Sequence, residues 1–256
     1  MSQSRSTHDH SHADALRIAY TADWHVLEVK GGAPVNQMQR LKALVDRLNE
    51  EAPDLVIHGG DLITRYSVDQ LPLPDHAIRG QYQQIDTLLG ALQSPIALFP
   101  GNHDVAFPVC REEWQRRFGK PGNGSTWDRS LALGPVHLVM MDGFALYDPE
   151  TGEQTGCSLT TEQIAWLEQE CRSAETSVPW RILALHYDYS DQVLPRLAEL
   201  GIDCFLYGHS SAHRADAFET SGCRNGHLPG SSAYRILTIT ANDFQIDLPV
   251  AYDTFT

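Results

Sequence analysis

The sequence lacks any apolar run that could cross a membrane, because no stretch approaches the roughly 18 to 20 residues that a spanning helix needs. Its N-terminal stretch, MSQSRSTHDHSHADALRIAY, also lacks the apolar core of a secretory signal. We therefore expect no membrane association. We also expect residues 1–14 to be a disordered leader, whose alternating histidines have no fixed geometry.

Cysteine is scarce, and no two cysteines form a Cys-x-x-Cys pair. An odd number of scattered cysteines, together with the missing signal, favours reduced thiols and a cytoplasmic location. The cysteines are Cys110, Cys157, Cys171, Cys204 and Cys223.

Basic residues are outnumbered, since 19 Lys and Arg stand against 33 Asp and Glu, and the formal net charge is −14. The electrostatic field of a protein with this negative charge repels polyanions, so we expect no nucleic-acid polymer as a partner. It leaves open a small phosphate-ester substrate that is held by a local positive charge. The charge balance does not indicate an oligomeric state.

The chain of 256 residues is long enough for a complete hydrophobic core, and no linker or internal repeat interrupts it, so we predict a single domain over residues 15–256. Short apolar stretches alternate with amphipathic ones in the first half, which indicates a parallel α/β sheet with right-handed crossovers. The expected strands are 16–21, 55–58, 96–99, 136–141, 181–186 and 204–207, with hairpin strands after residue 215. The expected helices are 37–51, 77–92, 112–118, a capped helix that follows Thr160, and 194–200.

Five of the expected strands end in side chains that can bind a metal ion. In open α/β sheets ligands bind beyond the carboxyl ends of the strands, so residues far apart in sequence can converge there. One such cluster is weak evidence, because a histidine at a strand end is more often a packed core residue, as we expect for His58. Five in succession predict a shared site. The clusters are DWH (23–25), GGD (59–61), GNHD (101–104), LHYD (185–188) and GHSSAH (208–213).

These motifs resemble the calcineurin-like metallophosphoesterases, whose pattern runs D-x-H, G-D, G-N-H-D/E, H and G-H-x-H. GNHD is the most specific element, and the resemblance extends over residues of about 16 to 240. It implies an α/β fold of the metallophosphoesterase type, a four-layer α/β/β/α sandwich of two mixed sheets flanked by helices. It also implies a dinuclear metal-dependent phosphoesterase, a hydrolase in which a metal-bridging hydroxide attacks phosphorus in line.

The resemblance also assigns a set of metal ligands, with Asp61 as the bridge between two divalent ions. The other ligands are Asp23 and His25 for the first ion, and Asn102, His186 and His209 for the second. Imidazole and carboxylate ligands suit Mn, Fe or Zn rather than Ca. Because the amide of Asn102 is neutral, the two carboxylates leave an excess of about two positive charges, which lowers the pKa of a bridging water and attracts a phosphate.

His103 has a separate role in the family, near the leaving-group oxygen, as a proton donor or a stabiliser of the transition state. An imidazole titrates near neutral pH, which suits that role. Asp104 is a candidate for orienting the ring, although adjacent side chains often point apart. Tyr187 and Asp188 follow a predicted ligand and are candidates for contacting the substrate, but for both a surface position is the simpler interpretation.

The last motif departs from the family pattern, because GHSS has Ser211 where the family has a histidine. A two-residue insertion would bring His213 to that position, and we predict His213 as the seventh ligand. The alternative leaves the first ion with Asp23, His25, Asp61 and water.

The residues that follow Asp61, the predicted bridging ligand, narrow the class of substrate. Protein phosphatases of this superfamily carry G-D-x-x-D-R-G, whereas this chain has GDLITRY, with Thr64 and Tyr66 in place of the aspartate and the glycine. Arg65 is a phosphate contact or, more simply, a solvated side chain. The loops 66–79 and 144–157 are expected to set specificity.

At this size the chain resembles the small bacterial phosphodiesterase branch, including the class III cyclic-nucleotide phosphodiesterases. We therefore expect a phosphodiesterase for a small substrate such as a cyclic nucleotide or a glycerophosphodiester. The alternatives are a phosphomonoesterase of the same fold and a metal-poor, non-catalytic binding scaffold.

Overall fold

A computed structural model of the chain describes residues 15–30, 33–67, 69, 71–120, 126–144, 146–148, 154–156, 158–173, 178–189, 192–209, 222–228 and 233–251. The leader predicted over residues 1–14 lies outside this set, as do Ser211 and His213. Among the described helices, none is both long enough and apolar enough to cross a bilayer.

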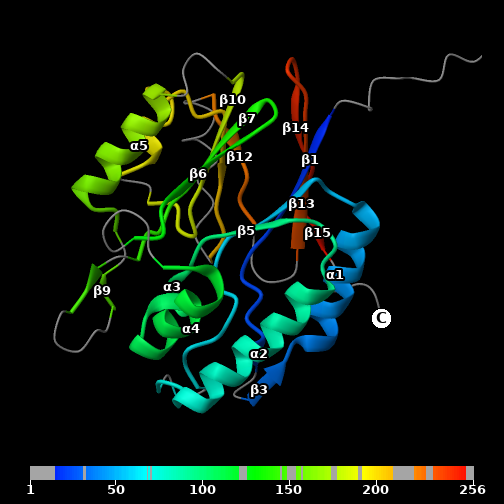
Figure 1. The fold of residues 1–256 in the computed structure, drawn as a ribbon, viewed down its shortest axis with the longest axis vertical. Helices are drawn as coiled ribbons and strands as arrows, with labels where there is room; N and C mark the ends of the chain where they lie inside the picture. The colour runs from blue at the N-terminus through cyan, green and yellow to red at the C-terminus, as the bar shows by residue number, and fades with distance from the viewer. Residues whose placement is uncertain are drawn as a thin grey trace, which may run out of the picture.

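Two mixed β-sheets lie at the centre of the fold (Figure 1). The first has the order β14-β13-β1-β4-β5, and β15 also pairs with β13. Its strands β1, β4 and β5 are parallel, whereas β13 runs antiparallel to β1 and to β14. The bounds are β1 Leu16–Thr21, β4 Leu55–His58, β5 Ile96–Leu98, β13 Ala233–Ile239, β14 Phe244–Ile246 and β15 Val250–Ala251.

The second sheet has the order β12-β11-β10-β7-β6. Strands β12, β11, β10 and β7 are parallel, and β6 pairs antiparallel with β7 at the edge. The bounds are β6 Arg129–Leu133, β7 Val136–Met140, β10 Trp180–Ala184, β11 Cys204–Leu206 and β12 Arg224–Asn225. The hairpin expected after residue 215 is confirmed for β13 and β14, while β12 joins this sheet instead.

Helices cover the outer faces of both sheets. In Figure 1, α1 and α2 lie on one outer side of the molecule and α5 lies on the opposite side. The helices are α1 Met38–Glu51, α2 Asp75–Ala91, α3 Asn102–Val105, α4 Pro108–Phe118 and α5 Thr161–Ser173. Two small hairpins complete the described elements: β2 Leu27–Lys30 with β3 Ala33–Asn36, and β8 Leu146–Tyr147 with β9 Gln154–Gly156.

The alternation of side chains along each strand creates three apolar cores. In β1, Ala19 faces the helix layer with Leu44 of α1, while its neighbour Ile18 faces the second sheet. In β7, Leu138 faces the first sheet and Val139 packs toward α5. Three cores between four layers confirm the predicted α/β/β/α sandwich.

The ends of two predicted helices show where local sequence is sufficient and where it is not. The capping box of α5 is present, because Thr160 Oγ1 accepts the N–H of Gln163 and Gln163 Oε1 accepts the N–H of Thr160. The helix predicted over 194–200 is wrong, since only the 3₁₀ turn Leu194–Arg196 forms. Gly201 ends the segment in a left-handed conformation with φ of 60°.

Candidate metal centre

The predicted ligands lie on tight loops that directly follow the strands. Asp23 follows β1, Asp61 follows β4, and His209 follows β11. These three residues and His25 have left-handed backbone conformations, with φ of 54°, 59°, 56° and 40° respectively. A non-glycine residue in such a conformation costs on the order of 1–3 kcal/mol. Their concentration on four predicted ligands marks this edge of the sheets as a functional site.

Asp61 occupies the centre of the site. Its Oδ2 lies 3.2 Å from His186 Nε2 and 3.6 Å from His25 Nε2, while its Oδ1 accepts the backbone N–H of His103 at 2.8 Å. Two groups of possible ligand atoms, each within 4.8 Å of one another, share this carboxylate. One group is Asp23, Asp61, His186 and His209, and the other is His25, Asp61 and His103. Asp61 is therefore the carboxylate that ligands of two neighbouring ions could share. The groups divide the other predicted ligands differently from the family pattern, because Asp23 lies with His186 and His209 and not with His25.

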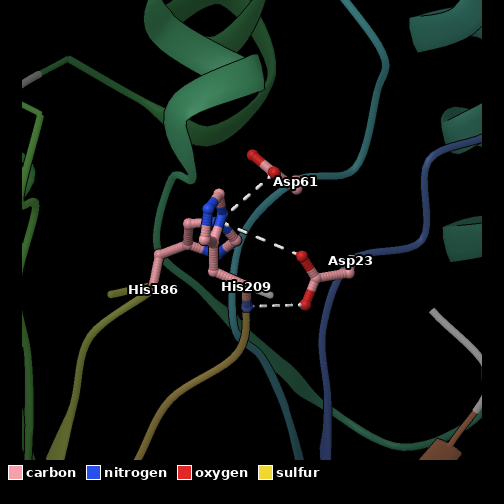
Figure 2. Close-up of side chains that lie close together, drawn as sticks. All are labelled: Asp23, Asp61, His186 and His209. Atoms are coloured by element: carbon pink, nitrogen blue, oxygen red, sulfur yellow. Dashed lines mark hydrogen bonds and ion pairs between the residues drawn. The ribbon is translucent and has the colours of Figure 1, made fainter. Parts of the chain in front are cut away.

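Figure 2 shows how the first group converges from separate strands. The backbone N–H of His209 donates to Asp23 Oδ2 at 3.0 Å, and the ring Nδ1 of His209 lies 3.3 Å from His186 Nε2. Since β1 belongs to the first sheet while β10 and β11 belong to the second, the site lies where the carboxyl ends of strands from both sheets meet.

Two histidines are oriented by backbone carbonyl groups. His186 Nδ1 lies 2.7 Å from the carbonyl oxygen of Gly59, and His25 Nδ1 lies 3.1 Å from that of Ile63. A carbonyl only accepts, so each Nδ1 donates and each Nε2 faces Asp61. Histidine ligands of metal ions commonly have this arrangement, which fixes the tautomer and the ring orientation.

The charges of the metal-free site also fit a cation. Burial opposes a charged imidazole, but the carboxylates of Asp61 and Asp23 outweigh it and raise the pKa of His186 to about 10. Burial raises the pKa of Asp23, whereas His186 is the main group that holds the pKa of Asp61 well below its usual range, against the effect of burial. A protonated His186 therefore balances two buried carboxylates, and metal ions could take over that balance.

Asn102 adds an independent indication. Its side-chain oxygen is buried and accepts no hydrogen bond within the part of the chain that the structure describes. A buried polar atom without a partner costs about 1–3 kcal/mol, and coordination to a cation removes that cost. The donor set of carboxylate, imidazole and amide oxygen therefore fits the predicted metal ions.

The comparisons with known proteins agree with this geometry. Residues 16–212 match the calcineurin-like phosphoesterase family. The chain belongs to this family. As a calcineurin-like phosphoesterase it is a metal-dependent phosphoester hydrolase, and the family uses two divalent metal ions.

Solved structures share the fold of this phosphoesterase at low sequence identity. A dimetal phosphatase from Danio rerio superposes with a TM-score of 0.67 and 14% identity, over 94% of this chain and 100% of that one. A purple acid phosphatase from yellow lupin (Lupinus luteus) seeds superposes with a TM-score of 0.64 and 13% identity, over 94% of this chain and 52% of that one. GAP50, the anchor in the inner membrane complex of Plasmodium, superposes with a TM-score of 0.57 and 12% identity, over 94% of this chain and 86% of that one. At such identities the likeness concerns the fold alone.

His103 of the phosphoesterase has a defined tautomer. The backbone N–H of Arg65 donates to His103 Nδ1 at 3.0 Å, so Nδ1 carries no proton and the neutral ring carries its proton on Nε2. Burial lowers the pKa of His103 to about 3, which keeps the ring neutral. His103 therefore presents an N–H at Nε2 rather than a lone pair. This favours a position at the leaving group over a role as a metal ligand. Because the ring is neutral, it favours the role of a hydrogen-bonding stabiliser over that of a proton donor, which would need the imidazolium form.

Asp104 does not orient His103, contrary to the sequence-based suggestion. Its buried carboxylate accepts the backbone N–H groups of Gly101 and Asp61 at Oδ2 and those of Leu62 and Ile63 at Oδ1. Burial and the neighbouring Asp61 carboxylate raise the pKa of Asp104, whereas the backbone N–H donors lower it and favour the ionised form, since all four partners donate. Asp104 thus ties the turn that carries His103 to the loop that carries Asp61.

Arg65 is not a solvated side chain, so that interpretation is wrong. Its Nη1 donates to the carbonyl oxygen of Asn102 at 3.0 Å, and its guanidinium lies 4.6 Å from the centre of the Tyr66 ring.

His58 packs as expected, because its ring meets Trp24 edge to face at 4.7 Å and its Nδ1 accepts the N–H of Gly60.

The sequence did not predict that aromatic rings contact two of the predicted ligands. The Tyr187 ring lies 4.4 Å from that of His209, and the Phe144 ring lies 5.7 Å from that of His186. Asp188 is buried and Tyr187 is half-buried, so the expected surface positions are wrong. The only sequence signal was that Tyr187 is next to a predicted ligand and that Phe144 follows an expected strand.

Proposed function

We propose that this calcineurin-like phosphoesterase is a phosphodiesterase that acts on a small substrate such as a cyclic nucleotide or a glycerophosphodiester. The observation that carries the proposal is the position of Asp61, whose carboxylate is shared by the two groups of possible metal ligands. Such sharing is the geometry of a two-metal site that holds both the attacking and the leaving oxygen.

The proposed ligands follow the order of the motifs. Asp61 would bridge the two ions. By the order of the motifs, Asp23, His25 and His213 would hold the first ion, and Asn102, His186 and His209 would hold the second. In the metal-free structure Asp23 lies with His186 and His209, so its assignment to the first ion rests on the motif order alone. When bound, the ions lower the pKa of a water molecule and stabilise negative charge on the phosphoryl oxygens.

His103 acts on the opposite side of the phosphorus from the nucleophile. Because Arg65 N–H occupies Nδ1, the neutral ring of His103 donates a hydrogen bond from Nε2 to the oxygen of the leaving group, which stabilises the negative charge that develops there. The half-buried guanidinium of Arg65, held by the carbonyl oxygen of Asn102, adds positive charge beside the site. A diester carries one negative charge, so this single guanidinium and two partly neutralised cations are sufficient to hold it.

The proposal is tested with purified protein, whose metal content is measured before the assay. Hydrolysis of bis(p-nitrophenyl) phosphate and p-nitrophenyl phosphate is then followed with and without added Mn²⁺. We expect Mn²⁺ to stimulate both reactions, with the larger kcat/KM for the diester. A larger kcat/KM for the monoester would overturn the diester assignment in favour of a phosphomonoesterase. Absence of hydrolysis at every metal loading would support a binding scaffold.

A further inference from the structure

Residues Arg65–Ser67 pair with residues Leu71–Leu73 beside His103. The N–H of Leu73 donates to the carbonyl oxygen of Arg65 at 2.9 Å, and the N–H of Ser67 donates to that of Leu71 at 2.8 Å. Tyr66 also forms an isolated β-bridge with Pro72. These bonds hold the start of the loop in a defined position relative to the site, since the backbone of Arg65 is itself bonded to His103.

The loop presents an aromatic surface next to the catalytic ring, which we name the aromatic shelf and define as Tyr66, Phe107 and the Arg65 guanidinium. The Tyr66 ring lies 6.2 Å from the His103 ring and 5.9 Å from the Phe107 ring. The guanidinium lies 4.6 Å from the centre of the Tyr66 ring and 5.9 Å from that of Phe107. Tyr66 and Phe107 are half-buried, so part of each ring remains accessible to a bound molecule.

The shelf lies on the side of the site where the leaving group departs. Under the proposed function, His103 Nε2 donates to the leaving-group oxygen, so the substituent on that oxygen extends past the neighbours of His103. One of these neighbours is His25, at 4.8 Å, and the other is Tyr66. A planar ring gains stacking energy against an accessible aromatic side chain and a guanidinium, whereas a glycerol group does not.

We propose that the aromatic shelf selects phosphodiesters whose leaving group carries a planar ring, such as a nucleoside or an aryl alcohol, over those that release glycerol. This inference rests on the proposed function and deepens it. Tyr66 is a specificity-determining residue in this arrangement, and it takes no part in the bond-breaking step.

The first test uses wild-type protein loaded with Zn²⁺ and compares the binding of adenosine and methyl β-D-ribofuranoside by titration calorimetry. Both probes contain a β-ribofuranosyl ring, and a methoxy group takes the place of the base in the second. Adenosine is expected to bind at least threefold more tightly than the methyl riboside, in line with stacking on one aromatic ring. Equal affinity would overturn the proposal.

The second test compares variants on two substrates, methyl p-nitrophenyl phosphate and glycerophosphoethanolamine. Tyr66→Leu is expected to lower kcat/KM about three- to tenfold for the aryl substrate and less than twofold for the glycerol substrate. Tyr66→Phe keeps the ring and should retain both values. Leu71→Ala is the loop control, because Leu71 is 62% exposed in the same loop. Each ratio compares variant and wild type on one substrate, so the intrinsic reactivity of the leaving group cancels.

The outcomes separate this inference from the proposed function. An equal loss on both substrates in Tyr66→Leu would overturn the shelf while leaving the phosphodiesterase assignment intact. Failure of the wild type to hydrolyse any phosphodiester with any metal would overturn the proposed function, and the shelf with it. Should Tyr66→Leu fail to fold, the comparison of adenosine with methyl β-D-ribofuranoside on the wild type still decides the question.

Discussion

Replacing Asp104 by asparagine tests whether this carboxylate holds the loop that carries Asp61. The side chain is fully buried and accepts four backbone N–H groups. Gly101 and Asp61 donate to Oδ2 at 2.9 and 2.7 Å, and Leu62 and Ile63 donate to Oδ1 at 2.9 and 3.4 Å. All four partners are donors, so a carboxylate can satisfy them and an amide cannot.

The expected magnitude follows from these contacts. Asparagine has nearly the shape of aspartate, so packing is preserved, but in either orientation its NH₂ group faces two backbone N–H groups. A hydrogen bond to a charged acceptor contributes about 1.5–3 kcal/mol, so two lost bonds lower the free energy of unfolding by about 3–6 kcal/mol. The loss falls in the lower half of this range if the NH₂ group faces the N–H groups of Leu62 and Ile63, because the hydrogen bond from Ile63 is already long in the wild type.

The assay is urea unfolding followed by tryptophan fluorescence in the presence of a chelator, so that metal binding does not add to stability. Asp46→Asn, at an exposed position of α1, is the matched control for the change of charge. The metal content of the variant is measured separately, and we expect weaker binding because Asp61 shifts with its loop. A loss of unfolding free energy below about 1 kcal/mol with full metal content would refute the assignment.

Four further predictions concern the metal centre. Asp61→Ala should lose both ions by elemental analysis and nearly all hydrolysis, and a variant with full turnover would refute the bridge. His103→Ala should keep its metal and lose about 10²- to 10⁴-fold in rate, most with poor leaving groups; a fall in metal content would make it a ligand instead. In Gly101→Ala the new Cβ would collide with Asp61 Oδ1, so Zn²⁺ affinity should fall, and an unchanged affinity would contradict this contact. Because the pKa of His186 is raised to about 10 in the metal-free protein, metal must displace its proton at neutral pH. Metal affinity should therefore rise with pH up to about 10, and calorimetry in two buffers that shows no proton release would contradict it.

Local patterns in the sequence were sufficient for much of the fold. The strands β1, β4 and β5 and the helices α1 and α2 begin and end within a few residues of the predicted positions, because their apolar periodicity and flanking turn residues act over short distances. The capping box of α5 was predictable for the same reason, since Thr160 and Gln163 are three residues apart. The motifs at the strand ends were visible because parallel strands place their carboxyl ends at one edge.

The tertiary structure alone decided how the polar groups of the site pair with one another. The contacts of Asp104 with Asp61 and of Arg65 with His103 join residues about forty positions apart, and sequence spacing carries no signal for such bonds. The left-handed conformations of Asp23, Asp61 and His209 oppose the intrinsic preference of these residues, so only the surrounding packing maintains them. The sequence by itself therefore determined which chemistry the chain carries, while the fold decided which atoms face each other, because that choice depends on contacts between distant segments.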